Sequence, residues 1–458
     1  MPGRTGRMLV SVALIAVALA TRIANAQDAA RPDSGNGTPD KAFQKVKREY
    51  QQKARNRKPA ERIAALKLLE DFPTADAAEL IYLTLIDDHA DDVRQAAMSL
   101  LVSWRERDEV CDRLFTRMKT ATRQNGMDLR ALGAMRVLAG TEDPALQERV
   151  LKFLDEFLGT ERIDQFLLHA MIDAGPAPGD AEEFSRMLML FSRATFFDSH
   201  FGFRRCTAQG LMQTRSKDEL EHLIDLLPRL KGLVLIDVVS HLNRVTGQDF
   251  GDDVAKWKSW LAQRGDKAKS IERPKTAGSG RIREYYGIPI TAKRVVFVLD
   301  TSGSMLGAKI AAAQTELIRV VMELPEAVFF NVIAFDKSVR VWQPMLVPAA
   351  NELKEAAVSA ILEQQARGAT ASFDALEAAF GLDPEAIYFV SDGAPSGGKT
   401  DVPKDIIATI SKWNRVRRIS IHSIGIGIDA KNEKTANLFS RFMRGLAEAN
   451  WGIFTSLN

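Results

Sequence analysis

The pattern of apolar positions divides the chain into two regions with different periodicities. From residue 42 to 264, apolar residues recur at helical spacing, for example at Ile63, Leu66 and Leu69, with short breaks between helices. From residue 291 to 458, short apolar runs typical of strands alternate with helical patterns. The sequence therefore predicts a multidomain protein in which an all-α region precedes an α/β domain with a mainly parallel, doubly wound sheet.

The first region shows a repeat. Helices are predicted to start at Ala60, Asp91 and Met127, at intervals of roughly 31 to 37 residues, which suit a paired-helix unit that stacks on its neighbours. Residues 91–101 resemble the second half of a HEAT repeat, in which a Val-Arg pair and small residues let adjacent helices approach. We therefore expect residues 42–264 to form a HEAT-like solenoid, with a generic helical domain as the alternative.

The second region contains enough alternating elements for a complete α/β domain at residues 291–458. The predicted strands are residues 295–299, 328–335, 339–342, 386–390, 419–424 and 452–455. The predicted helices are residues 308–323, 351–365, 373–380, 404–414 and 434–448. Strands buried on both faces and connected by helices specify a parallel sheet covered on both sides.

The segments outside these domains carry signals of their own. Arg4 and Arg7 precede the apolar run 8–20, and Ala24-Asn25-Ala26 offers the small-x-small pattern of signal peptidase sites. We read residues 1–26 as a signal peptide, because the apolar run is shorter than the roughly 20 residues needed to span a bilayer. This predicts an extracytoplasmic protein, periplasmic or secreted, without an integral membrane span after cleavage. The polar residues 27–41 suggest a disordered tether, and residues 265–290 an interdomain linker.

Composition excludes several classes of protein. The chain has 62 Lys and Arg against 59 Asp and Glu, and three of the basic residues lie in the predicted leader. The mature chain would thus be formally neutral, which argues against a nucleic-acid partner. Two cysteines and six scattered histidines exclude a disulfide scaffold, a zinc ribbon and a His-based metalloprotease. Cys111 and Cys206 could pair in an oxidising compartment or remain buried thiols.

Polar residues suited to metal binding gather after the predicted strands of the α/β domain. Asp300 ends the first strand and is followed by Ser302 and Ser304, whereas Thr370 precedes a helix and Asp392 follows another strand. In an open α/β sheet such loops meet at the carboxyl ends of the strands. Hydroxyls and carboxylates without thiols or imidazoles are ligands for a hard cation, and Mg²⁺ suits a site with few anions. Mn²⁺ and Ca²⁺ are the alternatives.

Because these five residues occur in the right order along the chain, the segment from about residue 293 to 458 resembles a von Willebrand factor type A domain. Asp300-x-Ser302-x-Ser304, Thr370 and Asp392 match its metal-ion-dependent adhesion site at all five positions. The resemblance implies direct coordination by Ser302 and Ser304, direct or water-mediated coordination by Thr370, and largely water-mediated coordination by both aspartates. It also implies an open position for a carboxylate of a protein partner. Ala369 departs from the Gly-Gly-Thr that is frequent in the family, which would strain the loop if that position required a positive φ.

Three functional hypotheses follow. The first is an exported, non-enzymatic binding or scaffold protein that binds an Asp or Glu side chain of a protein partner through the metal. The second assigns partner binding to the helical repeats and treats the metal site as vestigial. The third is a Mg²⁺-dependent hydrolase with Asp300 as nucleophile, but Ser302 stands where such enzymes carry a second aspartate. At the level of the residues themselves, Ser302 and Ser304 could also simply cap the following helix.

Overall fold

The computed structural model describes residues 41–125, 128–157, 162–176, 179–214, 216, 218–264, 283–427 and 433–457. The predicted signal peptide, nearly all of the predicted tether and most of the predicted linker lie outside these residues. None of the helices in the described ranges combines the length and the apolar character that a bilayer crossing requires. Cys111 and Cys206 are both buried and unpaired.

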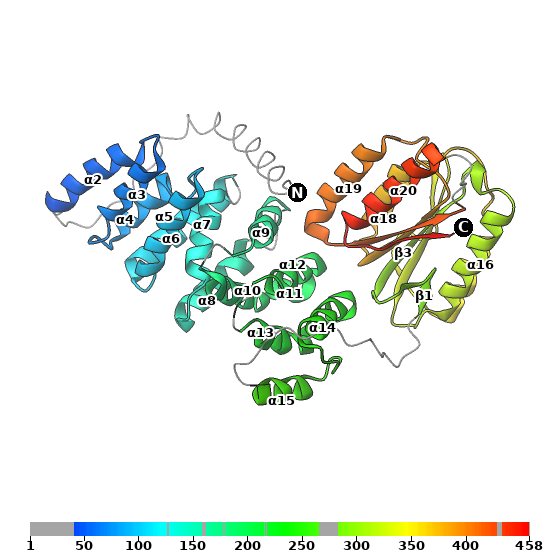
Figure 1. Cartoon of the computed structure of the whole chain (residues 1–458), viewed down its shortest axis with the longest axis horizontal. Coiled ribbons are helices and arrows are strands. Elements are labelled where there is room, and N and C mark those ends of the chain that lie inside the picture. The colour runs from blue at the N-terminus through cyan, green and yellow to red at the C-terminus, as the bar shows by residue number, and fades with distance from the viewer. Residues whose placement is uncertain are drawn as a thin grey trace.

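The first part of the chain is an array of helices, drawn from blue to green in Figure 1. Its α-helices are α2 (Lys41–Ala54), α3 (Pro59–Lys67), α4 (Ala75–Thr84), α5 (Asp91–Trp104), α6 (Asp108–Asn125), α7 (Leu129–Ala139), α8 (Pro144–Phe157), α9 (Arg162–Ala174), α10 (Ala181–Ser192), α11 (Thr195–Ser199), α12 (Phe201–Leu211), α13 (Glu219–Leu226), α14 (Gly232–Thr246) and α15 (Val254–Arg264).

These helices stack as a solenoid. Helices α3, α5, α7, α10, α12 and α14 contact one another in that order, and α4 packs against α6 in the other layer. The three predicted helix starts fall within two residues of the starts of α3, α5 and α7, which are consecutive members of one layer. One apolar core runs through the whole array, from Phe43 to Trp257. The prediction of stacked paired helices is confirmed, because each unit buries its apolar side against the next.

The second part is an α/β domain with a seven-stranded sheet. Its strands are β3 (Arg294–Asp300), β4 (Phe329–Phe335), β5 (Val339–Val341), β6 (Val347–Pro348), β7 (Ala386–Ser391), β8 (Ser420–Ile426) and β9 (Phe454–Leu457). The strand order is β5-β4-β3-β7-β8-β9, with β6 also paired to β4. The pairs β3–β4, β3–β7, β7–β8 and β8–β9 are parallel, whereas β5 and β6 run antiparallel to β4.

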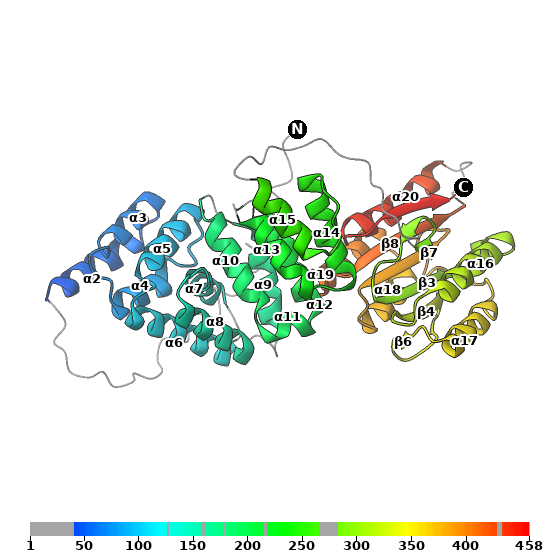
Figure 2. The same cartoon turned by 90° about the horizontal axis from the view of Figure 1, so that it is seen from below.

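Helices cover both faces of this sheet, as Figures 1 and 2 show. The alternating side chains of β3 divide between two cores. Val295, Phe297 and Leu299 pack with α16 (Ala308–Glu323) and α17 (Asn351–Leu362). Val296 and Val298 pack with α18 (Ser372–Gly381), α19 (Pro403–Arg417) and α20 (Glu433–Glu448). The doubly wound fold is therefore as predicted, since a parallel strand buried on both faces needs helices on both sides.

One part of the expected linker is ordered. Residues 284–289 form a hairpin of β1 (Glu284–Tyr285) and β2 (Ile288–Pro289). Tyr285 is fully buried and its ring lies edge-on to Phe297, with centroids 5.4 Å apart. The interpretation of the whole of residues 265–290 as linker was wrong at its carboxyl end, because the apolar side chains of this hairpin belong to the core of the α/β domain.

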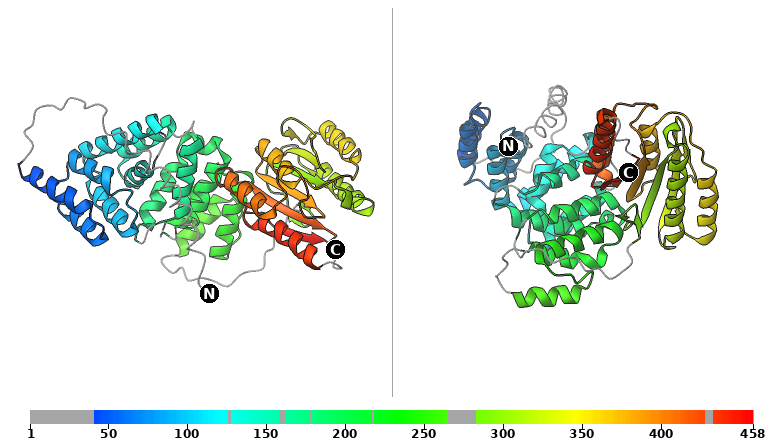
Figure 3. Two further views of the ribbon diagram at one scale, coloured as in Figure 1. Left: turned by 90° about the horizontal axis from the view of Figure 1, so that it is seen from above. Right: turned by 45° about the vertical axis from the view of Figure 1, so that its right-hand side comes forward.

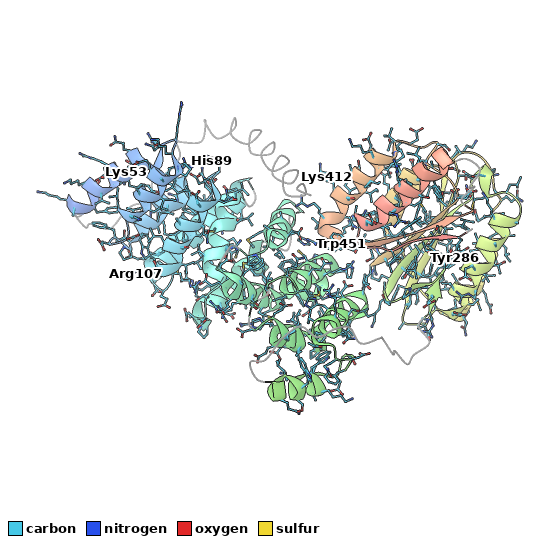
Figure 4. All side chains as sticks on the ribbon, viewed as in Figure 1. Lys53, His89, Arg107, Tyr286, Lys412 and Trp451 are labelled. Carbon is cyan, nitrogen blue, oxygen red and sulfur yellow. The ribbon has the colours of Figure 1, made fainter. Side chains whose placement is uncertain are left out.

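The helical array contacts the α/β domain at the amino ends of the sheet strands. Arg418 comes just before β8, and its guanidinium donates to Asp173 Oδ1 (2.6 Å) and Gln209 Oε1 (2.9 Å) of the array. Arg205 of α12 donates to the Arg418 carbonyl oxygen at 2.5 Å. Trp451 precedes β9, and the Arg418 guanidinium lies over its indole, with Cζ 4.9 Å from the ring centroid. Helix α19 contacts α9 and α12 at this boundary (Figure 3), and Figure 4 labels Trp451 there.

Two buried histidines make the stability of the fold sensitive to acid. Burial, and next the charge of Arg418, lowers the pKa of His169 to about 3; burial, and next Arg205, lowers the pKa of His422 to about 4. Both stay neutral in the folded chain while the unfolded chain protonates them below a pKa near 6.5. The stability that these two histidines contribute is therefore fully present above about pH 6.5 and is lost as the pH drops below that value.

We expect each histidine to account for about 2 kcal/mol of lost stability between pH 7 and pH 5. Denaturant unfolding at the two pH values measures the loss, and the double variant His169→Gln/His422→Gln should show a smaller one. An equal pH dependence in the parent chain and the double variant would show that other groups control acid unfolding. His422 also accepts from the Ile453 amide and stacks on Tyr388, as a core histidine does.

Candidate functional site

The loops that carry Asp300 and Asp392 lie where the chain connections of the sheet run to opposite sides. After β3 the chain crosses to β4 on one side, whereas β7 lies on the other side of β3. The carboxyl ends of β3 and β7 thus border a switch point, which is the place where open α/β sheets bind ligands. Asp300 is the last residue of β3 and Asp392 comes directly after β7. The helical array docks at the opposite end of the sheet, so it leaves these loops uncovered.

The loop after β3 is organised by Asp300. One carboxylate oxygen accepts from the Ser302 amide at 2.7 Å, and the other accepts from Ser391 Oγ at 2.5 Å. Asp300 is fully buried. Ser302 Oγ and Ser304 Oγ lie 3.1 Å apart. The aspartate therefore fixes the serine loop, in which Ser302 is buried and Ser304 is exposed.

Asp392 joins the same cluster from β7. Its Oδ1 accepts from Ser304 Oγ at 2.6 Å, and its Oδ2 accepts from Lys309 Nζ, also at 2.6 Å. The Asp392 carboxylate is fully buried, whereas the Lys309 side chain, on the first turn of α16, is 37% exposed. Because the Ser304 hydroxyl gives its proton to Asp392, Ser302 Oγ donates the bond between the two serines, and one lone pair of Ser304 remains available to a cation.

Thr370 lies on the neighbouring loop. Gly303 donates its amide to the Gly368 carbonyl oxygen at 3.0 Å, which ties this loop to the first serine loop. Thr370 is buried, and its amide donates to Ser396 Oγ at 3.1 Å. The left-handed residue of this loop is Gly368, with φ of 73°, and Ala369 is not among the residues with positive φ. Alanine at position 369 therefore causes no backbone strain.

The donor set fits a small hard cation. Two oxygen ligands at adjacent positions of octahedral Mg²⁺, each at about 2.05 Å, lie about 2.9 Å apart, close to the spacing of the two serine hydroxyls. Burial, and also the neighbouring Asp392 charge, raises the pKa of Asp300 to about 6, although bonds from Ser391 and Ser302 oppose this. Of the two buried carboxylates only Asp392 has an ammonium partner, Lys309, which leaves negative charge that a divalent ion would neutralise.

Within the described ranges, no three carboxylate, imidazole or thiol groups lie close enough together to hold a metal ion by themselves. That result agrees with a donor set in which hydroxyls outnumber carboxylates. The structure thus brings Asp300, Ser302, Ser304 and Asp392 into one hydrogen-bonded cluster, and it places Thr370 on the loop beside them. The same serines do not cap the next helix, because α16 begins at Ala308 without a side-chain cap bond.

Sequence reasoning missed two residues of this cluster. Ser391 holds Asp300, and its position directly before Asp392 at a strand end could have suggested that role. Lys309 pairs with Asp392, but a lysine on the first turn of an amphipathic helix resembles any solvated residue. Nothing in its spacing distinguishes it from the other surface lysines.

The α/β domain is similar to domains of known proteins. Residues 293–451 match the family model of the von Willebrand factor type A domain. The chain is similar to inter-alpha-trypsin inhibitor heavy chain H4 of Bos taurus, with 31% identity over 180 residues that cover 35% of this chain and 19% of that protein. It is also similar to human von Willebrand factor A domain-containing protein 3A, with 30% identity over 31% of this chain and 12% of that protein.

The matched region coincides with the α/β domain. Among solved structures, a von Willebrand factor type A protein from Catenulispora acidiphila aligns with a TM-score of 0.32 and 24% identity, covering 37% of this chain and 40% of that one. The chain spans about a fifth of the length of the heavy chains it matches. The match of residues 293–451 to the family model shows that the chain carries a von Willebrand factor type A domain, as the sequence predicts, behind a helical amino-terminal region.

Proposed function

We propose that this chain is an exported, non-enzymatic binding protein whose type A domain engages a carboxylate of a protein partner through a bound Mg²⁺ ion. The observation that carries the proposal is the cluster of Asp300, Ser302, Ser304 and Asp392 at the uncovered end of the sheet, with Thr370 beside it. The leader-like residues 1–26 support export.

In this proposal the two serines and Thr370 supply neutral oxygen ligands, and the two aspartates hold them in place and balance the charge. A cation held mainly by hydroxyls keeps positive charge, so it attracts an anionic ligand from a partner. When bound, the metal supplies that one electrostatic contact. Asp300 orients the first loop, since both of its oxygens already accept hydrogen bonds.

The helical array would then act as a scaffold. It is fixed to the amino ends of the strands through Arg418 and Arg205. The protein would then present the metal site at the carboxyl end of the sheet and an extended helical surface beyond the amino end. Relatives of the type A domain include inhibitor heavy chains, and their similarity is consistent with a binding role in place of catalysis.

The test is capture of partners from an extract of the producing cell's envelope by the immobilised chain. The arms are the chain with Mg²⁺, the chain with EDTA, and Asp300→Ala with Mg²⁺, with retained proteins identified by mass spectrometry. A partner retained only in the first arm supports the proposal. A partner retained equally in all three arms would transfer the binding function to the helical array.

Lys309 should weaken metal binding in the parent chain. Its ammonium group lies on Asp392, so it repels a divalent ion that needs the same carboxylate. We expect Lys309→Met to raise the Mg²⁺ affinity roughly three- to tenfold at low salt, and less at high salt, because the lysine is partly exposed. Calorimetric titration measures this, and a weaker affinity in the variant would instead mean that Lys309 holds Asp392 in place for the metal.

A further inference from the structure

We infer that the partner presents an acidic segment, because a basic rim borders one side of the metal site. This inference rests on the proposed function. The basic rim consists of Lys337, Arg340 and Arg367. It lies on the β4 side of the cluster, at the same end of the sheet as the serine loop.

The basic rim is joined directly to the site. The Arg367 amide donates to the Thr301 carbonyl oxygen at 2.8 Å, and Thr301 is the residue before the first serine ligand. Arg340 Nη2 donates to Thr301 Oγ1 at 2.7 Å. Lys337 packs beside Gly368, where an added Cβ would lie 3.5 Å from Lys337 Cγ. A partner that reaches the metal from this side must therefore pass these three cations.

The charges of the basic rim are incompletely neutralised. Arg340 and Arg367 share one oxygen of Asp336, at 3.0 and 3.4 Å, and the Asp336 side chain is only 1% exposed. The Arg367 side chain is 67% exposed, and Lys337 is exposed without an ion pair anywhere in the ranges that the structure describes. Three cations thus face one buried carboxylate, so positive charge remains for a ligand in solvent.

The loop that follows Asp392 differs. Its Lys399 pairs with Glu377, and the Lys399 amide donates to Asp374. Asp401 on the same loop is exposed. Lys309, which packs beside Gly427 after β8, is paired with Asp392. Among these groups the surplus of positive charge lies at the basic rim, which sets the direction in which the ligand extends. A chain with one carboxylate on the metal would place its further acidic residues toward Arg367 and Lys337, at about 3.3 Å per extended residue.

The experiment compares two synthetic peptides in Mg²⁺ and in EDTA. The first has a single Asp among Gly and Ser residues, and the second carries three additional Glu residues after that Asp. We expect the parent chain in Mg²⁺ to bind the acidic peptide five- to tenfold more tightly at low salt. That preference should shrink with added salt, because exposed charges are screened beyond about 10 Å at 0.1 M.

The variants locate the effect. Lys337→Ala/Arg367→Ala should reduce the preference to about twofold and still bind the single-acid peptide, which also shows that the site is folded. Lys412→Ala removes the charge of an exposed lysine on α19, on the side of the domain that faces the helical array (Figure 4), and should leave the preference unchanged.

The outcomes separate this inference from the proposed function. Metal-dependent binding of both peptides with equal affinity would overturn the inference and leave the function standing. If neither peptide binds, both fail. Binding of the acidic peptide that persists in EDTA would overturn the inference as stated, because the basic rim would then act without the metal.

Discussion

Arg418→Ala is expected to separate the two domains and to lower the free energy of unfolding by about 2 to 4 kcal/mol. The Arg418 side chain is 3% exposed, and its guanidinium binds Asp173, Gln209 and the sulfur of Cys206 across the boundary. Removing one member of a buried, hydrogen-bonded pair leaves the other members without a partner. Small-angle scattering should show a larger radius of gyration, and denaturant unfolding a lower midpoint. Arg418→Lys is expected to retain little of this stability, because an ammonium group lacks the planar set of donors of a guanidinium.

A second variant tests the same boundary without changing charge. An added Cβ at Gly202 of α12 would lie 2.0 Å from the Val416 carbonyl oxygen of α19, so Gly202→Ala must push the helices apart. Gly381→Ala is the matched control, because nothing lies within 4 Å of its added Cβ. Both boundary variants should retain Mg²⁺ binding, which belongs to the other end of the sheet. Unchanged scattering in Arg418→Ala would contradict the account of this boundary.

Asp392→Ala is expected to lower the Mg²⁺ affinity by about 100-fold or more. The substitution removes a buried carboxylate that orients Ser304 and balances the charge of the ion. Mg²⁺ at 100 times its dissociation constant should stabilise the parent chain by about 2.7 kcal/mol, and the variant hardly at all. Thermal unfolding with Mg²⁺ and with EDTA measures the difference.

The control for this prediction is Asp401→Ala. It removes an exposed carboxylate from the loop that follows Asp392, without a contact to the serine cluster. The control should keep the full stabilisation by Mg²⁺. If both variants lose it equally, the effect is one of general surface charge and Asp392 has no specific role.

The α/β domain could be predicted in detail because its strands are buried on both faces. Val295 to Leu299 and Ala386 to Val390 are uninterrupted apolar runs, and each lies within the observed strand. Helix α16 has the predicted bounds, since its apolar residues repeat every three to four positions. The hairpin at residues 284–289 was missed because two-residue strands carry no periodicity, and polar residues precede them.

The candidate site was predictable in its composition but not in its electrostatics. Asp300, Ser302, Ser304 and Asp392 follow strands that any parallel arrangement would bring to one edge. Lys309 and Arg418 gave no such signal. Each is a basic residue in a helix or at its end, and only tertiary packing determines that one pairs with Asp392 and the other crosses a domain boundary.

The most direct test of the metal-mediated carboxylate contact is the linkage between its two ligands. Calorimetry would give the affinity of the acidic peptide with and without Mg²⁺, and the affinity of Mg²⁺ with and without that peptide. If the carboxylate binds the ion, each ligand must tighten the other by the same factor. Equal factors well above one, absent in Asp300→Ala, are the predicted result. Affinities that do not depend on the other ligand would contradict the account.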